Sequence, residues 1–358
     1  MEHRIKNWRR LLACSQSKNK LTEFLAESWK RENLRNKLCD KTMYVGYGEK
    51  CLKLTRNEWE EVEHLRCTHE EADTRLLLHA HHAAQCSASV VVVADDTDVM
   101  MICLGVNNSF SNAKLFLRRG TKSRVRIVDI TKLSQSLGKE VSSALPGLHS
   151  WTGCDSVSSF AGHGKVKALK LLQVNAKFRD AFISIGDSWD LKPDVFEVVE
   201  EFTCQMYSKN TPTVHVNDLR YEIFSCKKGS VESGQLPPCR DTLLQHTLRS
   251  NYQAAIWKRS LENFADIPEA SSEHGWQIDD NGDLTIKWMT GMPAPQAVIS
   301  LISCQCRRVC SASDGPCILN GLKCTTVCKL QSCTNIVDED DDVQQDSSDS
   351  DSDDDSNE

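Results

Sequence analysis

This sequence has no long apolar run and few aromatic residues. No apolar stretch approaches the 18 residues or so that suggest a membrane-spanning helix, so we expect no membrane segment. The first residues, MEHRIKNWRRLLACS, are basic but lack the apolar core of a signal peptide. Together with 17 cysteines, this predicts a reducing compartment and not secretion. Aromatic residues make up 6% and no internal repeat is visible, so 358 residues indicate two or three globular domains.

Lysine and arginine are absent from residues 338–358, which hold twelve acidic residues. Such a tail cannot bury a core and is predicted to be disordered. The whole chain has a formal charge of −7, but outside the tail 38 acidic residues face 43 basic ones, about +5. A mildly basic body is compatible with a nucleic-acid partner, and the acidic tail would compete with nucleic acid for that body. A tail that only solubilises the chain is the alternative.

Apolar periodicity predicts an α/β domain with a largely parallel sheet. A helix is expected over 69–85, with Thr68 as its N-cap and Glu71 as the capping-box partner. The run VVVVADDTDVMMICLG follows, and its valines predict a strand buried on both faces. KLFLRR and VRIVDI predict two shorter strands, and a helix is expected over 131–145.

Other patterns set the expected domain boundaries. TMYVGYGEKCLKLT predicts a hairpin after an N-terminal helix, helices are expected over 195–206 and 241–261, and 279–295 reads as a linker. The expected domains are an N-terminal helix and hairpin (1–68), the α/β domain (69–210), a helical extension with linker (211–300), a cysteine-rich segment (301–335) and the acidic tail (336–358).

Acidic residues gather where the valine strand ends. Two carboxylates about 4 Å apart repel by roughly 4 kcal/mol at an effective dielectric near 20, so converging carboxylates need a proton or a cation. One interpretation is that Asp96 or Asp98 simply caps the next helix. The other is a site for Mg²⁺ or Mn²⁺, which prefer oxygen ligands and support phosphodiester hydrolysis. The candidate ligands are Glu71, Asp73, Asp96, Asp98 and Asp155.

These residues carry a resemblance to a known family. EAD at 71–73, DTD after the valine strand and GCD at 153–155 resemble the acidic motifs of the flap-endonuclease and XPG-type 5′ nucleases, which are PIN-like domains. FAGHGKVKALKLL resembles the helix–two-turn–helix of that family, in which loop amides and lysines grip a duplex backbone. The resemblance implies a PIN-like three-layer fold. It also implies backbone contacts through Gly162, Gly164, Lys165 and Lys167.

A closer resemblance covers most of residues 8–335. HEEADTRLLLHA, the DTDV strand end and LPGLHSWTGCD are shared with a group of animal proteins associated with mobile elements. One departure from the nucleases is important, because no apolar strand ending in Asp precedes residue 70 and Asp40 is a poor substitute. The domain therefore reads as N-terminally incomplete, which leaves catalysis open.

Weaker patterns in the same region have simpler readings. GHGKV lacks the first glycine and the Ser or Thr of a phosphate-binding P-loop, so we reject that reading. His79, His81 and His82 do not share one helix face well, and Cys154 near His149 has no accompanying third group, so packing roles are expected. RRGTKSRVR is either a solvated turn or a further backbone contact through Arg118, Arg119 and Lys122.

Seven cysteines crowd into thirty residues with the spacing C-x-C-x3-C-x6-C-x6-C-x3-C-x4-C. In a reducing compartment this density predicts thiolates bound to Zn²⁺. The segment resembles the tesmin-like CXC domains, with Leu319 and Leu330 at two positions where those domains have cysteine. The predicted zinc ligands are Cys304, Cys306, Cys310, Cys317, Cys324, Cys328 and Cys333.

Three functions remain open at this stage. The first is a metal-dependent, structure-selective nuclease acting on DNA or RNA. The second is a nucleic-acid-binding protein without activity, and the third is a protein-interaction scaffold derived from a mobile element. The suspected partner favours a nuclear location, with the cytoplasm as the alternative.

Overall fold

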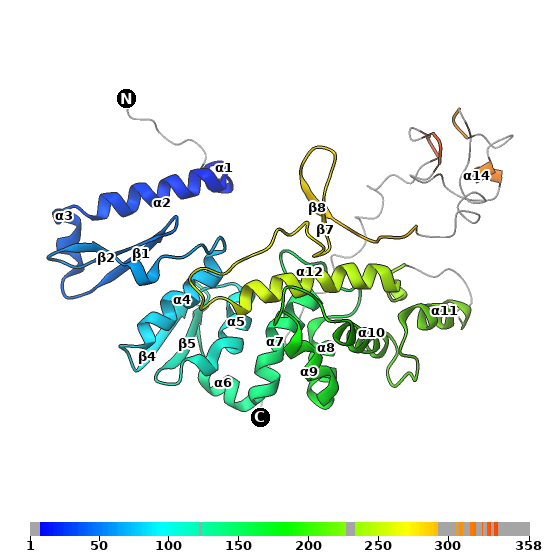
Figure 1. Cartoon of the computed structure of the whole chain (residues 1–358), viewed down its shortest axis with the longest axis horizontal. Coiled ribbons are helices and arrows are strands. Elements are labelled where there is room, and N and C mark those ends of the chain that lie inside the picture. Colours follow the sequence, from blue (N-terminus) through cyan, green and yellow to red (C-terminus); the bar gives the residue numbers. More distant parts are fainter. Residues whose placement is uncertain are drawn as a thin grey trace. The chain divides into compact units, whose positions relative to one another are not determined.

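The structure is a computed structural model. It describes residues 8–121, 124–226 and 233–292, and within the cysteine-rich segment residues 306, 308–310, 316–319, 324, 328–330 and 333–335. The chain divides into two compact units, Met1–Met289 and Thr290–Glu358, each of which is described by itself (Figure 1). The acidic tail and Lys122 lie outside the described residues.

The first unit begins with helices packed on a small antiparallel sheet of order β1-β2-β3. The predicted hairpin is confirmed, and its turn places Gly48 at a φ of +49°, a conformation that favours glycine. Ala26 packs against Val45 and Leu52 to bury this sheet. The elements are α1 (Trp8–Ala13), α2 (Ser15–Trp29), α3 (Glu32–Arg35), η1 (Asn36–Leu38), β1 (Met43–Tyr47), β2 (Lys50–Leu54), β3 (Trp59–Glu61) and η2 (Glu63–Leu65).

A second sheet, of order β4-β5-β6, forms the α/β part of the unit. Its elements are α4 (Ala72–Ala84), β4 (Ser89–Val93), α5 (Thr97–Val106), η3 (Asn107–Ser109), β5 (Lys114–Arg119), β6 (Arg126–Asp129) and α6 (Ile130–Leu137). β4 and β5 are parallel, but β5 and β6 are antiparallel, so the described sheet is mixed and not largely parallel. The reason is the short link between β5 and β6, because a parallel crossover needs a dozen or more residues.

The valine strand is buried on one face only, which corrects the expectation of burial on both. Val90 and Val92 are buried, whereas Val91 and Val93 are 52% and 57% exposed. The buried side packs against α4, α5 and α6 in one apolar cluster that includes Leu77, Ile102 and Ile130.

Helices make up the rest of the α/β and helical region (Figure 1). They are α7 (Lys139–Thr152), α8 (Lys165–Val174), α9 (Ala176–Ser184), α10 (Pro193–Tyr207), α11 (Val216–Cys226), η5 (Ser233–Gln235) and α12 (Arg240–Lys258). The single helix predicted over 131–145 is two helices, because Gly138 has a φ of +84° and separates α6 from α7. α12 packs against both apolar clusters of the unit, since Leu243 lies in the helical cluster and Trp257 in the sheet cluster.

The expected linker at 279–295 contains regular structure in its described part. β7 (Trp276–Ile278) and β8 (Leu284–Ile286) form an antiparallel hairpin. Arg249 of α12 is 1% exposed and its Nη1 donates hydrogen bonds to the carbonyls of Gly275 and Lys287, each at 2.9 Å. One buried guanidinium thus ties both ends of the hairpin to the helix.

The second unit is described only at its cysteine positions and at α14 (Pro316–Leu319). Within the part of the chain that the structure describes, none of the helices has the length and apolar character needed to cross a bilayer.

Candidate functional site

Helix α4 begins at Ala72, later than predicted, so the Glu71 side chain does not form the predicted capping box. The N-cap is Glu71 itself, with no side-chain cap, whereas the backbone N–H of Thr68 donates to the carbonyl of Asn263. The predicted capping box is therefore wrong, because Thr68 is held by a distant loop instead of the helix. The Glu71 carboxylate instead accepts a hydrogen bond from Gln253 Nε2 at 3.1 Å.

The acidic loop between β4 and α5 combines capping with site geometry. Asp96 is the N-cap of α5, and its Oδ1 accepts from the backbone N–H of Asp98 at 2.9 Å, so the capping interpretation is confirmed for Asp96. Asp95 points elsewhere, since its carboxylate accepts from the backbone N–H of Gly120. Asp98 is 15% exposed and contacts His149 Nε2 through Oδ1 at 2.8 Å.

Asp73, on the first turn of α4, lies within electrostatic reach of the other four predicted carboxylates. Burial and, after it, the negative charges of Asp96, Glu71, Asp98 and Asp155, in that order, together raise the pKa of Asp73 to about 6. Burial is also the main reason that the pKa of Glu71 is raised, with Asp98 adding to it. The side chains come from the start of α4, the β4–α5 loop and the loop after α7. Mutual repulsion makes this cluster a place where a cation would be stabilised.

The spacing of the carboxylates is looser than that of a closed metal site. Among the described histidine, cysteine and acidic side chains, only two trios bring their ligand atoms within 4.8 Å of one another, and both consist of cysteines. The carboxylate oxygens fit Mg²⁺ or Mn²⁺ by donor type, but no three of them reach that spacing.

A buried histidine and a lysine lie beside this carboxylate cluster. His149 is 4% exposed and lies between Asp98 and Lys165, whose Nζ is 3.0 Å from His149 Nδ1. Burial lowers the pKa of Lys165, and the nearby charges of Asp98 and Asp96 oppose that change. Lys165 thus turns toward the carboxylates, where the sequence predicted a contact with a nucleic-acid backbone.

A hydrogen-bonded chain holds Glu71 from the other side. Cys154 Sγ lies 3.4 Å from Ser156 Oγ, which donates to Gln253 Oε1 at 2.6 Å, and Gln253 then donates to Glu71. Sequence reasoning missed Ser156 and Gln253, and it considered His149 only as a partner of Cys154. The available signal was the polarity of α12, where Gln253 is buried although the helix lacks an apolar stripe.

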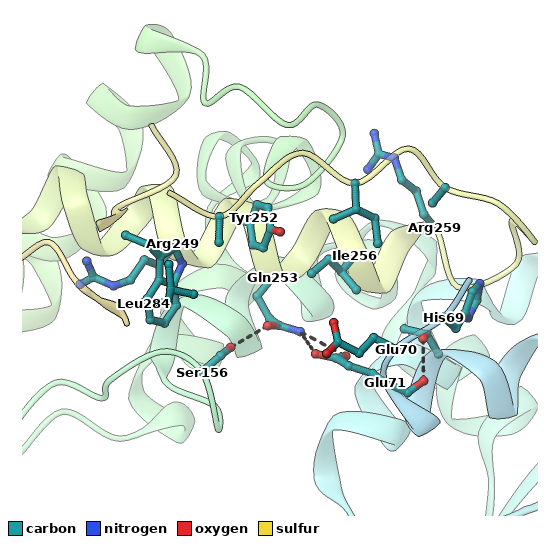
Figure 2. A pocket seen from close by; sticks show the side chains of 15 residues that line it. His69, Glu70, Glu71, Ser156, Arg249, Tyr252, Gln253, Ile256, Arg259 and Leu284 are labelled. Carbon is teal, nitrogen blue, oxygen red and sulfur yellow. Dashed lines mark hydrogen bonds between the residues drawn. The ribbon is translucent and has the colours of Figure 1, made fainter. Parts of the chain in front are cut away.

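A cavity of about 330 Å³ is lined by Glu71 of the carboxylate cluster and by Ser156 (Figure 2). Figure 2 shows Gln253 reaching from α12 toward Ser156 on one side and Glu71 on the other. Its walls are mostly apolar, with Tyr252 and Ile256 of α12 among the side chains that line it.

The residues expected to contact a nucleic-acid backbone lie in different settings. Gly162 has a φ of +70°, and both it and Gly164 have open space where a Cβ would lie, so their backbone is accessible. Lys167 is exposed. Arg119 donates to the Asp95 carbonyl at 2.9 Å, whereas Arg118 lies on the opposite face of the sheet because adjacent strand residues alternate.

In the second unit, buried cysteines form a cluster that could hold a metal ion such as zinc. One trio is Cys310, Cys324 and Cys333, and the other is Cys317, Cys324 and Cys328. Cys324 belongs to both, and its Sγ lies 3.5 Å from Cys310 Sγ. Cys306 is half-buried beside the cluster, and Cys304 lies outside the described residues.

Comparisons with family models, curated proteins and solved structures find no match for this chain. The geometry of the two sites therefore carries the functional argument.

Proposed function

We propose that this chain binds nucleic acid in the nucleus. We also propose that its carboxylate cluster holds divalent cations that support phosphodiester hydrolysis. The observation that carries the proposal is the gathering of five acidic side chains from three separate segments around Asp73. Folding brings these charges together at a cost in repulsion, which a bound cation would offset.

Glu71, Asp73, Asp96, Asp98 and Asp155 would hold the ions, with Mg²⁺ or Mn²⁺ matching their oxygen donors. Such ions supply charge stabilisation and a lowered pKa for a bound water. His149 positions Asp98, and the Ser156–Gln253 chain positions Glu71. Gly162, Gly164, Lys167 and Arg119 would supply the backbone contacts on a PIN-like plan.

The test is cleavage of labelled flap, hairpin and single-stranded DNA and RNA in Mg²⁺ or Mn²⁺. We expect Asp98→Asn to lower the cleavage rate by about 100-fold or more, because it removes one charge from the carboxylate cluster. Asp95→Asn is the matched control, since Asp95 lies in the same loop but faces Gly120, and its activity should be unchanged. Equal rates for wild type and Asp98→Asn would contradict hydrolysis at this site.

A second candidate function is nucleic-acid binding without hydrolysis. It is favoured by the contact of Lys165 with His149, which itself contacts Asp98, because this places a cation of the protein itself beside the carboxylates. Binding that persists in a chelator, with no cleavage in any divalent ion, would identify this function.

The proposed binding surface predicts different effects for the two lysines. Lys167→Ala should weaken binding of all nucleic-acid sequences alike and reduce the salt dependence of the affinity, because a phosphate contact releases counterions. Lys165→Ala should leave that salt dependence unchanged, since Lys165 contacts His149. Fluorescence anisotropy at several salt concentrations measures both effects, and an equal loss in the two variants would contradict the assignment.

We further propose that the cysteine cluster binds zinc, on a degenerate CXC-like plan that includes Cys304 and Cys306. Cys324 belongs to both trios. Cys324→Ser should therefore lower the zinc content of the purified chain more than the same substitution at an exposed cysteine. Cys39→Ser, an exposed cysteine of the first unit, is the control. Metal analysis that finds no zinc in the wild-type chain would contradict this proposal.

A further inference from the structure

One face of the sheet β4-β5-β6 is apolar and open. The strand register places its side chains in two rows across the three strands. Val91, Phe116 and Asp129 form the first row, and Val93, Arg118 and Ile127 form the second. Ile127 is 64% exposed and, like Val91 and Val93, is among the most exposed large apolar side chains of the strands.

This exposure is unusual for the sequence that produces it. A valine-rich strand in a parallel pair is normally covered on both faces, and monomers rarely leave contiguous apolar patches exposed. Here α4, α5 and α6 all pack on the opposite face. β4 is also an edge strand, since β5 is its only neighbour among the described strands. The pattern indicates a face that another polypeptide covers.

The charged side chains of the two rows, Arg118 and Asp129, indicate which polypeptide that is. The Arg118 guanidinium has no ion-pair partner among the described side chains. Asp129 uses one oxygen to accept from the backbone N–H of Lys132 at 2.8 Å, which leaves the other oxygen available. The two rows therefore carry four apolar side chains, one cation and one anion, and Arg118 and Asp129 are complementary to each other between two copies. Lys114 extends the same face in the next row, beside Ser89.

We propose that two copies of the chain pack these open faces together about a two-fold axis. In such an interface the same surface meets itself, so Arg118 of each copy can contact Asp129 of the other. Val91, Val93, Phe116 and Ile127 supply the apolar contact around these ion pairs. The helices that carry Glu71, Asp73 and Asp98 lie on the opposite face of the sheet, so the dimer leaves the proposed cation site open.

Six residues bury less than the roughly 800 Å² per partner of a standard interface. We therefore expect a reversible dimer with a dissociation constant in the micromolar range, on the order of 1–50 µM. Sedimentation velocity and light scattering across roughly 1–200 µM cover that range.

The first experiment removes apolar contact from the face. Val93→Thr combined with Ile127→Thr keeps β-branched strand residues and should raise the dissociation constant about ten-fold or more. Ile278→Thr is the matched control, because Ile278 is a similarly exposed strand isoleucine on the separate β7–β8 hairpin. It should dimerise like the wild type. A wild-type chain that stays monomeric over the whole range overturns the proposal.

The second experiment tests the two-fold arrangement itself. Arg118→Glu alone and Asp129→Lys alone each place like charges opposite one another, so each should be monomeric. Mixed in equal amounts, they should form a heterodimer, because one native ion pair and one charge-reversed ion pair then form across the interface. Asp129→Asn, which keeps an acceptor for the α6 cap, checks that any loss in Asp129→Lys is not misfolding. Single variants that dimerise as tightly as the wild type, or a mixture that stays monomeric, would exclude this face.

Discussion

The pKa of Asp73 reflects the charge of the whole carboxylate cluster. Its folded-state pKa of about 6 lies above the usual value for aspartate, because burial and four neighbouring carboxylates disfavour its charge. The folded state therefore holds a proton that the unfolded state has already lost between about pH 4 and pH 6. By linkage, the stability associated with this proton is present at low pH and is lost as pH rises through about 6.

We predict that Asp73→Asn stabilises the fold at pH 8 in a chelator, by about 1 kcal/mol after allowance for partial exposure of the side chain. The gain should disappear near pH 3.5, where the wild-type carboxyl is protonated in both states. Urea unfolding at the two pH values measures the effect, with the exposed Asp180→Asn on α9 as a variant that should change little. A loss of stability at pH 8 would mean that favourable contacts, and not repulsion, dominate at Asp73.

At the scale of elements, sequence patterns located most helices and strands but missed how they are covered. The hairpin, β4, α10 and α12 lie close to where periodicity predicted them. The prediction that β4 is buried on both faces was wrong, because periodicity reports which side chains are apolar and not which neighbours cover them. The carboxylate residues could be proposed from spacing alone. Gln253 and His149 could not, because their contacts with Glu71 and Asp98 join positions far apart in the chain.

The packing of α5 against α7 depends on a small residue facing a proline. A Cβ added at Gly105 would lie 2.5 Å from Cγ of Pro146, which sits inside α7. Alanine normally stabilises a helix interior by about 1 kcal/mol relative to glycine, but here we expect Gly105→Ala to destabilise the fold by about 1–3 kcal/mol.

Thermal unfolding of a double-mutant cycle checks this contact. In a Pro146→Ala background the obstruction is gone, so Gly105→Ala should become neutral or stabilising. The same loss of stability with and without the proline ring would show that Gly105 is needed for another reason.

For the whole molecule, the separation of charge along the chain gives a further prediction. The tail holds twelve acidic residues while the remainder is about +5, so the two attract over a Debye length of roughly 8 Å at physiological salt. Ser348, Ser350 and Ser352 each precede an Asp by three residues, as acidophilic kinases prefer. Phosphorylation there would add about −1.5 to −2 charge per site.

Truncation after Val337 should tighten nucleic-acid binding at low salt, and the difference should shrink as salt rises. A chain with phosphomimetic Asp at the three serines should bind more weakly than the wild type. Identical affinity with and without the tail would leave it only a solubilising role.

The hydrogen bonds from Arg249 to Gly275 and Lys287 also limit how the first unit can be shortened. A fragment that stops before Gly275 would lose both carbonyl acceptors. The Arg249 guanidinium of α12 would then lack the hydrogen bonds that offset its burial. Limited proteolysis should therefore spare the β7–β8 hairpin, although it lies far along the chain from the carboxylates. Any shortened form of the first unit that keeps the carboxylate cluster intact must extend through about residue 288.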